Sequence, residues 1–315
     1  NTGDTLCSPT RKVVLEGVTY PEPVLSMAIL PKQKGEEDKV AQGVLRLLEE
    51  DPTLKFVNNA ETHQMILSGL GEQHLDVVVS KLKGKFGLDV TLEKPKVAYR
   101  ETIRKKVQAQ GKHKKQSGGH GQYGDVKIKF EPRQDGELDL QFVDKVVGGA
   151  VPRNFIPAVE KGLRDCISNG VLAGYPVVGL KATLYDGSYH PVDSSEMAFK
   201  VAASIAYKKG LEAAKPILLE PIMSVQILVP DNYMGDVMGD VNKRRGRVVG
   251  MEPEGKLQKI SAEIPMAEIF SYATDLRSMT QARGNFTSEF LRYDEVPTSE
   301  VGKILDNVRN LKEEV

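Results

Sequence analysis

The chain has 315 residues, which favours two or three domains because a single hydrophobic core rarely grows beyond about 250–300 residues. Lys plus Arg and Asp plus Glu both number 43, so the net charge gives no reason to expect a non-specific polyanion binder. No apolar run approaches the length of a membrane span, and Cys7 and Cys166 indicate neither a disulfide framework nor a zinc site. We therefore expect a cytosolic protein, and because the sequence starts at Asn1 we expect it to be part of a longer one.

The first region, 21–96, is predicted to fold as βαββαβ. Residues 24–31 predict a strand, about 35–50 a helix, and 54–59 and 63–69 two further strands. A second helix, which Gly87 ends, is followed by a strand in 88–95. That helix carries an i, i+3, i+4, i+7 apolar stripe of Leu75, Val78, Val79, Leu82 and Phe86.

The central region, 97–217, has a different pattern. Residues 126–130 and 138–142 alternate apolar with polar side chains, as half-buried strands do. A helix with Ile156, Val159 and Leu163 on one face comes next, followed by a strand in 177–185 and a further helix. A sheet with helices on one face, an α+β domain, fits this order.

The region 218–298 repeats the first order. Residues 221–230, 247–253, 256–265 and 285–296 predict strands, a helix with Met234 and Val241 follows the first strand, and a helix over about 266–282 precedes the last. Both repeats therefore predict the ferredoxin-like split βαββαβ fold. The tail, 299–315, predicts an amphipathic helix that packs onto the body.

Residues 186–200, DGSYHPVDSSEMAFK, form the most informative segment. A tight turn at Asp186-Gly187-Ser188 is predicted to precede Tyr189 and His190, and Pro191 rules out helix just before it. Either Asp193 or Ser194 is expected to cap the following helix, with Met197, Val201, Ala202 and Ile205 on one face. A tip of this kind can reach into a partner, although a plain surface loop fits the local sequence equally well.

The motifs that carry enzyme chemistry give no support here. Gly119–Gly124 matches GxGxxG, but a strand rather than a helix follows it, so a hairpin connection is the better interpretation. GxxxxGK[ST] is absent, and Ser194 and Ser195 lack a nucleophile-elbow context. The five histidines (63, 74, 113, 120 and 190) show no metal-ligand spacing, and His74 is expected to be exposed. We predict neither a catalytic nor a metal site.

Basic residues form three groups on separate predicted elements. Such groups can be solvated faces, or cations that complement a helix dipole. In a protein with no net charge, three such basic groups favour discrete contacts with RNA phosphates. Recognition would then follow the shape of the RNA rather than its base sequence. The groups are Arg104, Lys105, Lys106, Lys112, Lys114 and Lys115; Lys243, Arg244, Arg245 and Arg247; and Arg277 with Arg283.

Several long motifs resemble the translational GTPase elongation factor G over its domains III, IV and V. TGDTLC at the start is similar to the end of domain II, which would make 1–20 its tail and a linker, and FVNNAETHQMILSGLGEQHLDVVV resembles domain III. QSGGHGQYGDV, VVGGAVPRNFIPAVEKG and DGSYHPVDSSEMAFK resemble domain IV. EPIMSVQ, MGDVNKRRGRVVGME and YATDLRSMTQARGNF resemble domain V. The resemblance implies that the central domain is of the ribosomal protein S5 domain 2-like type.

The resemblance also implies where partners bind. The tip of domain IV would contact tRNA and messenger in the decoding region of the small subunit through Gly187, Ser188, Tyr189, His190, Gly148, Gly149, Val151 and Pro152. The domain V residues Lys243, Arg244, Arg245, Arg247, Arg277 and Arg283 would contact large-subunit rRNA near the GTPase-activating centre and the stalk base. GTP and Mg²⁺ would bind a GTPase domain that this chain lacks, and the protein would be a monomer.

The resemblance implies that the chain is the ribosome-binding part of a translational GTPase that promotes translocation, with His190 as a positioned contact. Gln73 stands where Leu is usual, His120 where Arg is usual, and Lys127 where an aromatic is frequent. These departures leave open whether the parent is the housekeeping factor or a paralogue. Two alternatives remain: a ribosome-protection or recycling paralogue of the same architecture, and a stand-alone enzyme that binds a nucleotide through Gly119–Gly124. Polypeptide synthesis in a factor-depleted system would separate the first from a translocase, and nucleotide titration would test the second.

Overall fold

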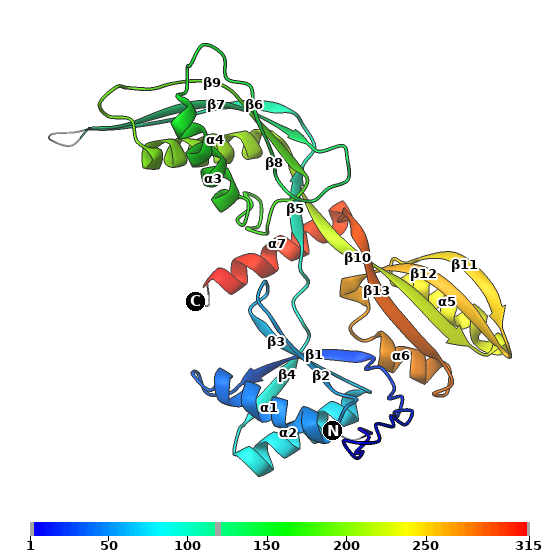
Figure 1. Cartoon of the computed structure of the whole chain (residues 1–315). Coiled ribbons are helices and arrows are strands. Elements are labelled where there is room, and N and C mark those ends of the chain that lie inside the picture. The colour runs from blue at the N-terminus through cyan, green and yellow to red at the C-terminus, as the bar shows by residue number, and fades with distance from the viewer. Residues whose placement is uncertain (1–2, 117–120, 314–315) are drawn as a thin grey trace. The chain divides into compact units, whose positions relative to one another are not determined.

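The computed structural model describes residues 3–116 and 121–313, with side chains described up to Arg309. The chain forms two compact units, Asn1–Ala98 with Pro221–Arg292 and Tyr99–Glu220 with Tyr293–Val315. The first unit holds both predicted βαββαβ repeats, and the second holds the central region and the C-terminal helix (Figure 1).

The first repeat has the ferredoxin-like topology that the sequence predicts. Its sheet has the order β2-β3-β1-β4 with antiparallel neighbours, and its core joins Val40, Val44 and Leu47 of the first helix to Leu75, Val78 and Leu82 of the second. Gly87 ends the second helix in a left-handed conformation, φ 68°. The elements are β1 (Leu25–Pro31), α1 (Glu37–Glu50), β2 (Lys55–Asn59), β3 (Gln64–Gly69), α2 (Glu72–Phe86) and β4 (Val90–Glu93).

The second repeat has the same topology, with the sheet order β11-β12-β10-β13. Val225, Ile227 and Val229 of β10 pack against Val237 and Val241 of α5 and against Leu276 of α6. The elements are β10 (Pro216–Val229), η2 (Asp231–Tyr233), α5 (Met234–Lys243), β11 (Arg247–Glu254), β12 (Leu257–Pro265), η3 (Met266–Glu268), α6 (Tyr272–Met279) and β13 (Asn285–Glu295).

The helix predicted over 266–282 is shorter than the sequence suggests. Its first turn is the 3₁₀ segment η3, and α6 ends at Met279. The Thr280 hydroxyl donates to the carbonyl of Leu276 (2.7 Å) and accepts the amide of Gly284 (2.8 Å). Gln281 and Ala282 then adopt left-handed conformations that stop the helix, with φ of 52° and 61°.

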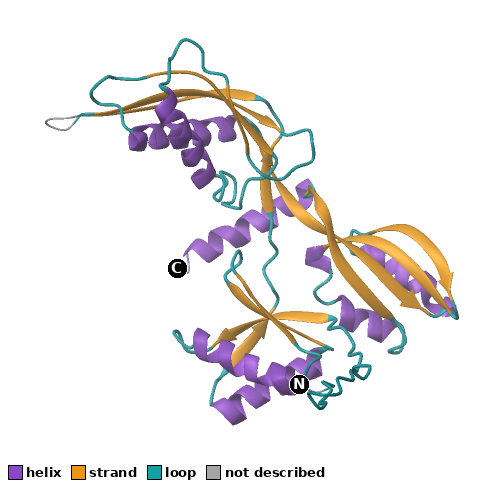
Figure 2. Ribbon diagram, viewed as in Figure 1, coloured by secondary structure: helices purple, strands orange, loops and turns teal. Residues whose placement is uncertain are grey.

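The central region is an α+β domain, as predicted. Its sheet has the order β6-β7-β9-β8, in which β8 is parallel to β9 and the other neighbours are antiparallel. Helices α3 and α4 lie on one face of this sheet (Figure 2) and bury Phe130, Leu163 and Phe199 with it. The elements are β5 (Arg100–Ile103), β6 (Val107–Lys115), β7 (Gln122–Pro132), β8 (Gln141–Asp144), η1 (Arg153–Phe155), α3 (Ile156–Cys166), β9 (Leu180–Ser188) and α4 (Glu196–Ala213).

Strand β10 begins five residues before the predicted strand. The additional residues pair with β5, a short strand that the sequence did not predict. Pro216–Leu219 pair with β5, whereas Ile222–Val229 pair with β12. The C-terminal helix α7 (Thr298–Glu313) packs through Val301, Ile304, Leu305 and Val308 on a cluster that contains Ala173, Leu218 and Val296. It therefore packs onto the body, as the sequence predicts.

Candidate nucleic-acid interface

The tip of the central domain starts where strand β9 ends. The tight turn predicted at Asp186–Ser188 is wrong, because β9 continues to Ser188 and pairs Gly187 with Val126. The glycine is needed for close packing. A Cβ at Gly187 would lie 2.3 Å from the carbonyl oxygen of Asp125 and 2.6 Å from Cγ2 of Val151.

His190 is held by its own loop. Its Nδ1 lies 3.1 Å from the backbone nitrogen of Asp193 and 3.3 Å from that of Val192, so it accepts from these amides. Nδ1 also lies 3.4 Å from a carboxylate oxygen of Asp193, which would be an ion pair only in a protonated ring. With Nδ1 as the acceptor, the neutral ring carries its proton on Nε2. The side chain is 51% exposed, so one edge is fixed and the other is accessible.

The loop after His190 is tied to strand β7. The Ser194 hydroxyl accepts the amide of His190 (2.9 Å) and donates to the carbonyl of Tyr123 (3.0 Å). Asp193 accepts the amide of Tyr123 on its carbonyl (2.8 Å) and that of Gly121 on its carboxylate (2.9 Å). Asp193 and Ser194 are thus engaged with β7 and do not cap helix α4. The cap is Ser195, whose hydroxyl accepts from the amide of Ala198 (3.2 Å).

A chain of side-chain hydrogen bonds continues below this loop. The Ser188 hydroxyl donates to Asp125 (2.8 Å), so the Tyr123 hydroxyl at 2.7 Å donates to Ser188. The other carboxylate oxygen of Asp125 accepts from the amide group of Gln110 (2.8 Å). Asp125 is only 6% exposed, and this network satisfies both of its oxygens. The tip therefore rests on a fixed polar base.

Exposed apolar side chains lie on the tip and on the adjoining first turn of helix α4. Tyr189 is 48% exposed, Val192 63% and Met197 62%. Met197 was expected on the buried face of its helix, but α4 instead buries Ala198, Phe199 and Ala202. Almost every side of this helix is apolar, so periodicity alone could not choose the face.

The second predicted tip region comes close to the first. Gly148 and Gly149 form an exposed turn in left-handed conformations, φ 69° and 70°. Val151 is 1% exposed and belongs to the core beneath Gly187, so the direct contact expected for its side chain is corrected to a supporting role. Pro152 follows it at the start of η1.

The departure at Lys127 has a local explanation. Its ammonium lies 2.7 Å from a carboxylate oxygen of Asp186, on the β9 neighbour in register. The Lys127 hydrogen bond lowers the pKa of Asp186 below its ordinary value. The ion pair occupies the cross-strand position at which the family resemblance led us to expect an aromatic.

Among the predicted rRNA contacts, Arg244 is a structural residue. Its guanidinium lies 2.6 Å from Asp240, donates to Asp275 (2.5 Å) and to the carbonyl of Glu268 (2.8 Å), and stacks 5.0 Å from the Tyr272 ring centre. The side chain is 11% exposed. We therefore correct its predicted role from RNA contact to a link between α5 and α6.

The other cations of this domain are more accessible. Lys243, Arg277 and Arg283 are exposed, and Arg247 is 71% exposed although it pairs with Glu263 (2.9 Å). Arg245, in a left-handed conformation (φ 58°), lies 3.4 Å from Glu268 and is only 28% exposed.

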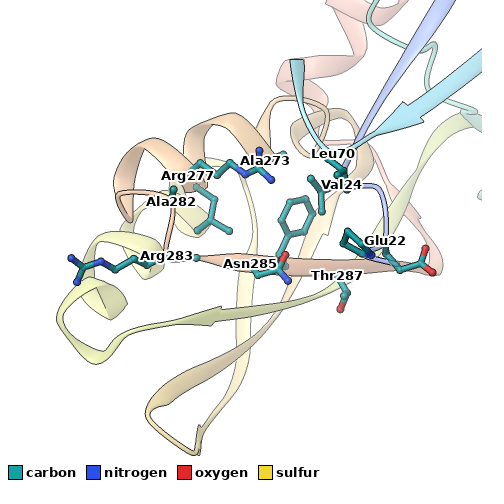
Figure 3. A pocket seen from close by; sticks show the side chains of 13 residues that line it. Glu22, Val24, Leu70, Ala273, Arg277, Ala282, Arg283, Asn285 and Thr287 are labelled. Atoms are coloured by element: carbon teal, nitrogen blue, oxygen red, sulfur yellow. Dashed lines mark hydrogen bonds between the residues drawn. The ribbon is translucent and has the colours of Figure 1, made fainter. Parts of the chain in front are cut away.

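Arg277 and Arg283 line one pocket of about 350 Å³ within the first unit, with Glu22, Val24 and Leu70 among its other walls. In Figure 3 the Arg283 side chain points away from the apolar walls, whereas that of Arg277 extends toward Leu70. A Cβ at Gly71 would lie 2.9 Å from the Arg277 guanidinium. The structure thus places both arginines at one pocket, with their side chains pointing in different directions.

The hairpin interpretation of Gly119–Gly124 agrees with the pairing of β6 and β7, although Gly119 and His120 lie outside the described residues. His74, expected to be exposed, is instead half-buried, accepting the Leu70 amide (3.1 Å) and donating to Asp51 (2.8 Å). In the described part of the chain, no group of three or more His, Cys, Asp or Glu could hold a metal ion. No helix there is long and apolar enough to cross a membrane.

These observations define a multidomain α+β protein with an exposed tip that hydrogen bonds hold against strand β7. Family models match almost the whole chain: elongation factor G domain III at 20–94, domain IV at 95–215 and the C-terminus at 217–304. A crystal structure of a protein from Thermus thermophilus is 43% identical with a TM-score of 0.83, and the match covers 93% of this chain and 44% of that one. The chain belongs to the elongation factor G family and carries its domains III, IV and V.

Sequence reasoning missed the base of the tip. In the sequence, Tyr123 and Asp125 stand within or directly after the glycine-rich segment, and no local signal links them to each other or to Gln110. Their roles follow from the register that places Asp125 opposite Ser188 and Lys112 opposite Asp125. The signal that could have indicated this supporting role was an aromatic and an acidic residue at the end of a glycine-rich connection.

Proposed function

We propose that this chain is the ribosome-binding part of a translational GTPase that promotes movement of tRNA and messenger during elongation. The tip around His190 enters the decoding region of the small subunit and hinders return of the tRNA. The chain acts as a lever rather than as a catalyst.

The observation that carries this proposal is the construction of the tip. The acceptor nitrogen of His190 is occupied by the backbone of its own loop, so the exposed edge of the ring offers a donor in a fixed orientation. Exposed Tyr189 and Val192 flank it, and Asp125 anchors the base. A fixed surface that combines apolar side chains with one hydrogen-bond donor suits contact with bases and sugars better than it suits proton transfer.

The remaining parts of the proposal follow from the family. Exposed Lys243, Arg247, Arg277 and Arg283 contact phosphates of large-subunit rRNA near the GTPase-activating centre and its stalk base. GTP and Mg²⁺ bind the GTPase domain that this class of protein implies, and the sequence of residues 1–315 itself contains no GxxxxGK[ST] motif. The protein acts as a monomer in the cytoplasm.

The test replaces His190 by Ala in the full-length protein. The variant should slow single-round translocation about tenfold or more and leave ribosome-stimulated GTP hydrolysis within about twofold, since one oriented hydrogen bond contributes roughly 1–2 kcal/mol. Lys161→Ala, at an exposed position of α3, is the matched control and should change neither rate. A normal translocation rate for His190→Ala would show that the assignment is wrong.

A further inference from the structure

One basic group remains without a role in the proposed function. From Thr102 to Gly124 the sequence contains no acidic residue but six lysines and arginines. The structure divides them between the two ends of strand β6, about 20 Å apart at 3.3 Å per residue.

The two ends differ in their partners. Arg104 pairs with Glu295, and Lys106 lies 3.9 Å from Glu131. Lys112, Lys114 and Lys115 are exposed and form no ion pair with any residue that the structure describes. The uncompensated charge is therefore concentrated at the end of β6 next to the tip.

The strand directs two of these lysines to one face. Lys112 is opposite Asp125 and Lys114 is opposite Tyr123, so all four side chains share a face. A Cβ at Gly111 would lie 1.9 Å from the carbonyl oxygen of Ala202 in α4, so the face of Gly111 is the one the helix covers. Lys112 and Lys114 therefore lie on the open face.

The nearby carboxylate of Asp125 does not neutralise the charge of these lysines. Asp125, the cross-strand neighbour of Lys112, is buried and accepts from Gln110 and Ser188 on its two oxygens. The Lys112 ammonium instead lies 5.6 Å from the centre of the Tyr123 ring, which packs near His190 with ring centres 6.3 Å apart. The lysines are thus continuous with the tip.

We propose that Lys112, Lys114 and Lys115 form a second RNA-binding site that contacts the phosphate backbone beside the bases or sugars touched by the tip. Lysine ammonium groups are point charges without base-reading geometry, and no stacked aromatic row accompanies them on the described part of β6, so the ligand is backbone rather than base edges. The phosphates belong to either tRNA or small-subunit rRNA. The inference rests on the proposed ribosomal role.

Strand position supplies a competing explanation. β6 is an edge strand, and lysines on edge strands prevent strand-to-strand association. Glutamate would keep that protection but repel phosphate, whereas alanine would remove both. The pair of variants therefore separates the two explanations.

The experiment measures affinity of the whole 1–315 chain for deacylated tRNA and, separately, for vacant small subunits over a salt series. Lys112→Glu/Lys114→Glu should weaken binding to at least one about tenfold and reduce the salt slope by about 1–2, because each phosphate contact contributes roughly 0.7–0.9. Lys208→Glu/Lys209→Glu, exposed on α4 with the same charge change, is the matched control and should keep the slope. Circular dichroism melting confirms that all variants fold.

Each outcome decides the inference. Weakening with tRNA alone assigns the phosphates to tRNA, and weakening with subunits alone assigns them to rRNA. If the salt slope of Lys112→Glu/Lys114→Glu equals that of the control with both probes, the proposed site is wrong. The proposal is also wrong if the only defect found is self-association of Lys112→Ala/Lys114→Ala. This experiment measures RNA affinity and not translocation. A failure of the proposed site can therefore be distinguished from a failure of the His190 prediction.

Discussion

Arg244 shows how a single residue can be misread when only its neighbours in sequence are known. Within the basic run KRRGR it has the appearance of an RNA contact, yet its guanidinium is used by two carboxylates, a carbonyl and an aromatic ring. A planar group with several donors can link elements in this way, which a lysine ammonium cannot. The chemistry of arginine allowed both roles, and only the surroundings distinguish them.

Replacing Arg244 by Ala should destabilise the last ferredoxin-like domain by about 3 kcal/mol, because Asp240 would lose its partner in a nearly buried site. Amide hydrogen exchange in α5 and α6 measures this effect. Arg247→Ala removes an exposed guanidinium, and Glu263 keeps its second partner Arg292, so this change should cost less than about 1 kcal/mol. Equal protection in the two variants would contradict the structural role.

The same substitution has a pH readout. The Arg244 hydrogen bond lowers the pKa of Asp275 below its ordinary value, outweighing a raising effect of burial. The pair therefore contributes stability above the ordinary pKa of the carboxyl, and this contribution is lost as the pH falls through the lowered pKa. In Arg244→Ala the carboxyl should titrate nearer its ordinary pKa, as NMR of its side chain would show.

At the scale of elements, Glu101 of β5 fixes the loop that supports helix α7. This carboxylate is 1% exposed and accepts the amides of four consecutive residues, from Leu172 to Tyr175, at 2.8–3.1 Å. Leu172 and Tyr175 belong to the apolar cluster on which α7 packs. One acid thus joins a strand, a loop and the C-terminal helix.

Glu101→Gln should loosen this connection, because a neutral amide offers a single acceptor oxygen and turns N–H groups toward other donors. Exchange of the amides of residues 172–175 should accelerate on the order of tenfold to a hundredfold. Glu160→Gln, which breaks an exposed i,i+4 pair with Arg164 in the same domain, is the control. Unchanged exchange in Glu101→Gln would exclude the anchoring role.

At the scale of the whole molecule, separate cores support separate tasks. The two ferredoxin-like domains and the central domain each have their own apolar cluster, so each can keep its shape while larger movements occur. The proposed lever action requires this property, since the tip would have to transmit force without local unfolding.

The translocation proposal also separates this protein from ribosome-protection and recycling relatives. The full-length protein should support polypeptide synthesis in a system depleted of its translocation factor, and the His190→Ala form should do so poorly. Splitting of subunits or eviction of a ribosomal ligand, without synthesis, would favour the alternative class instead.

The sequence by itself determined the three domains' fold classes, because apolar periodicity and helix-ending signals such as Gly87 act locally. It also identified the His190 segment, since Pro191 and a serine-rich start of a helix are local signals. It failed where the answer depended on a partner far along the chain: the turn at Asp186–Ser188, the capping residue of α4 and the role of Arg244.

Tertiary structure decided those points for a physical reason. Strand register brings Asp125 opposite Ser188, 63 residues away, and sheet order makes β6 an edge strand with Lys112 and Lys114 on the open face. Register and strand order arise from packing of the whole domain, so no short segment encodes them. The tip and its neighbouring lysines become a single surface only in the folded domain.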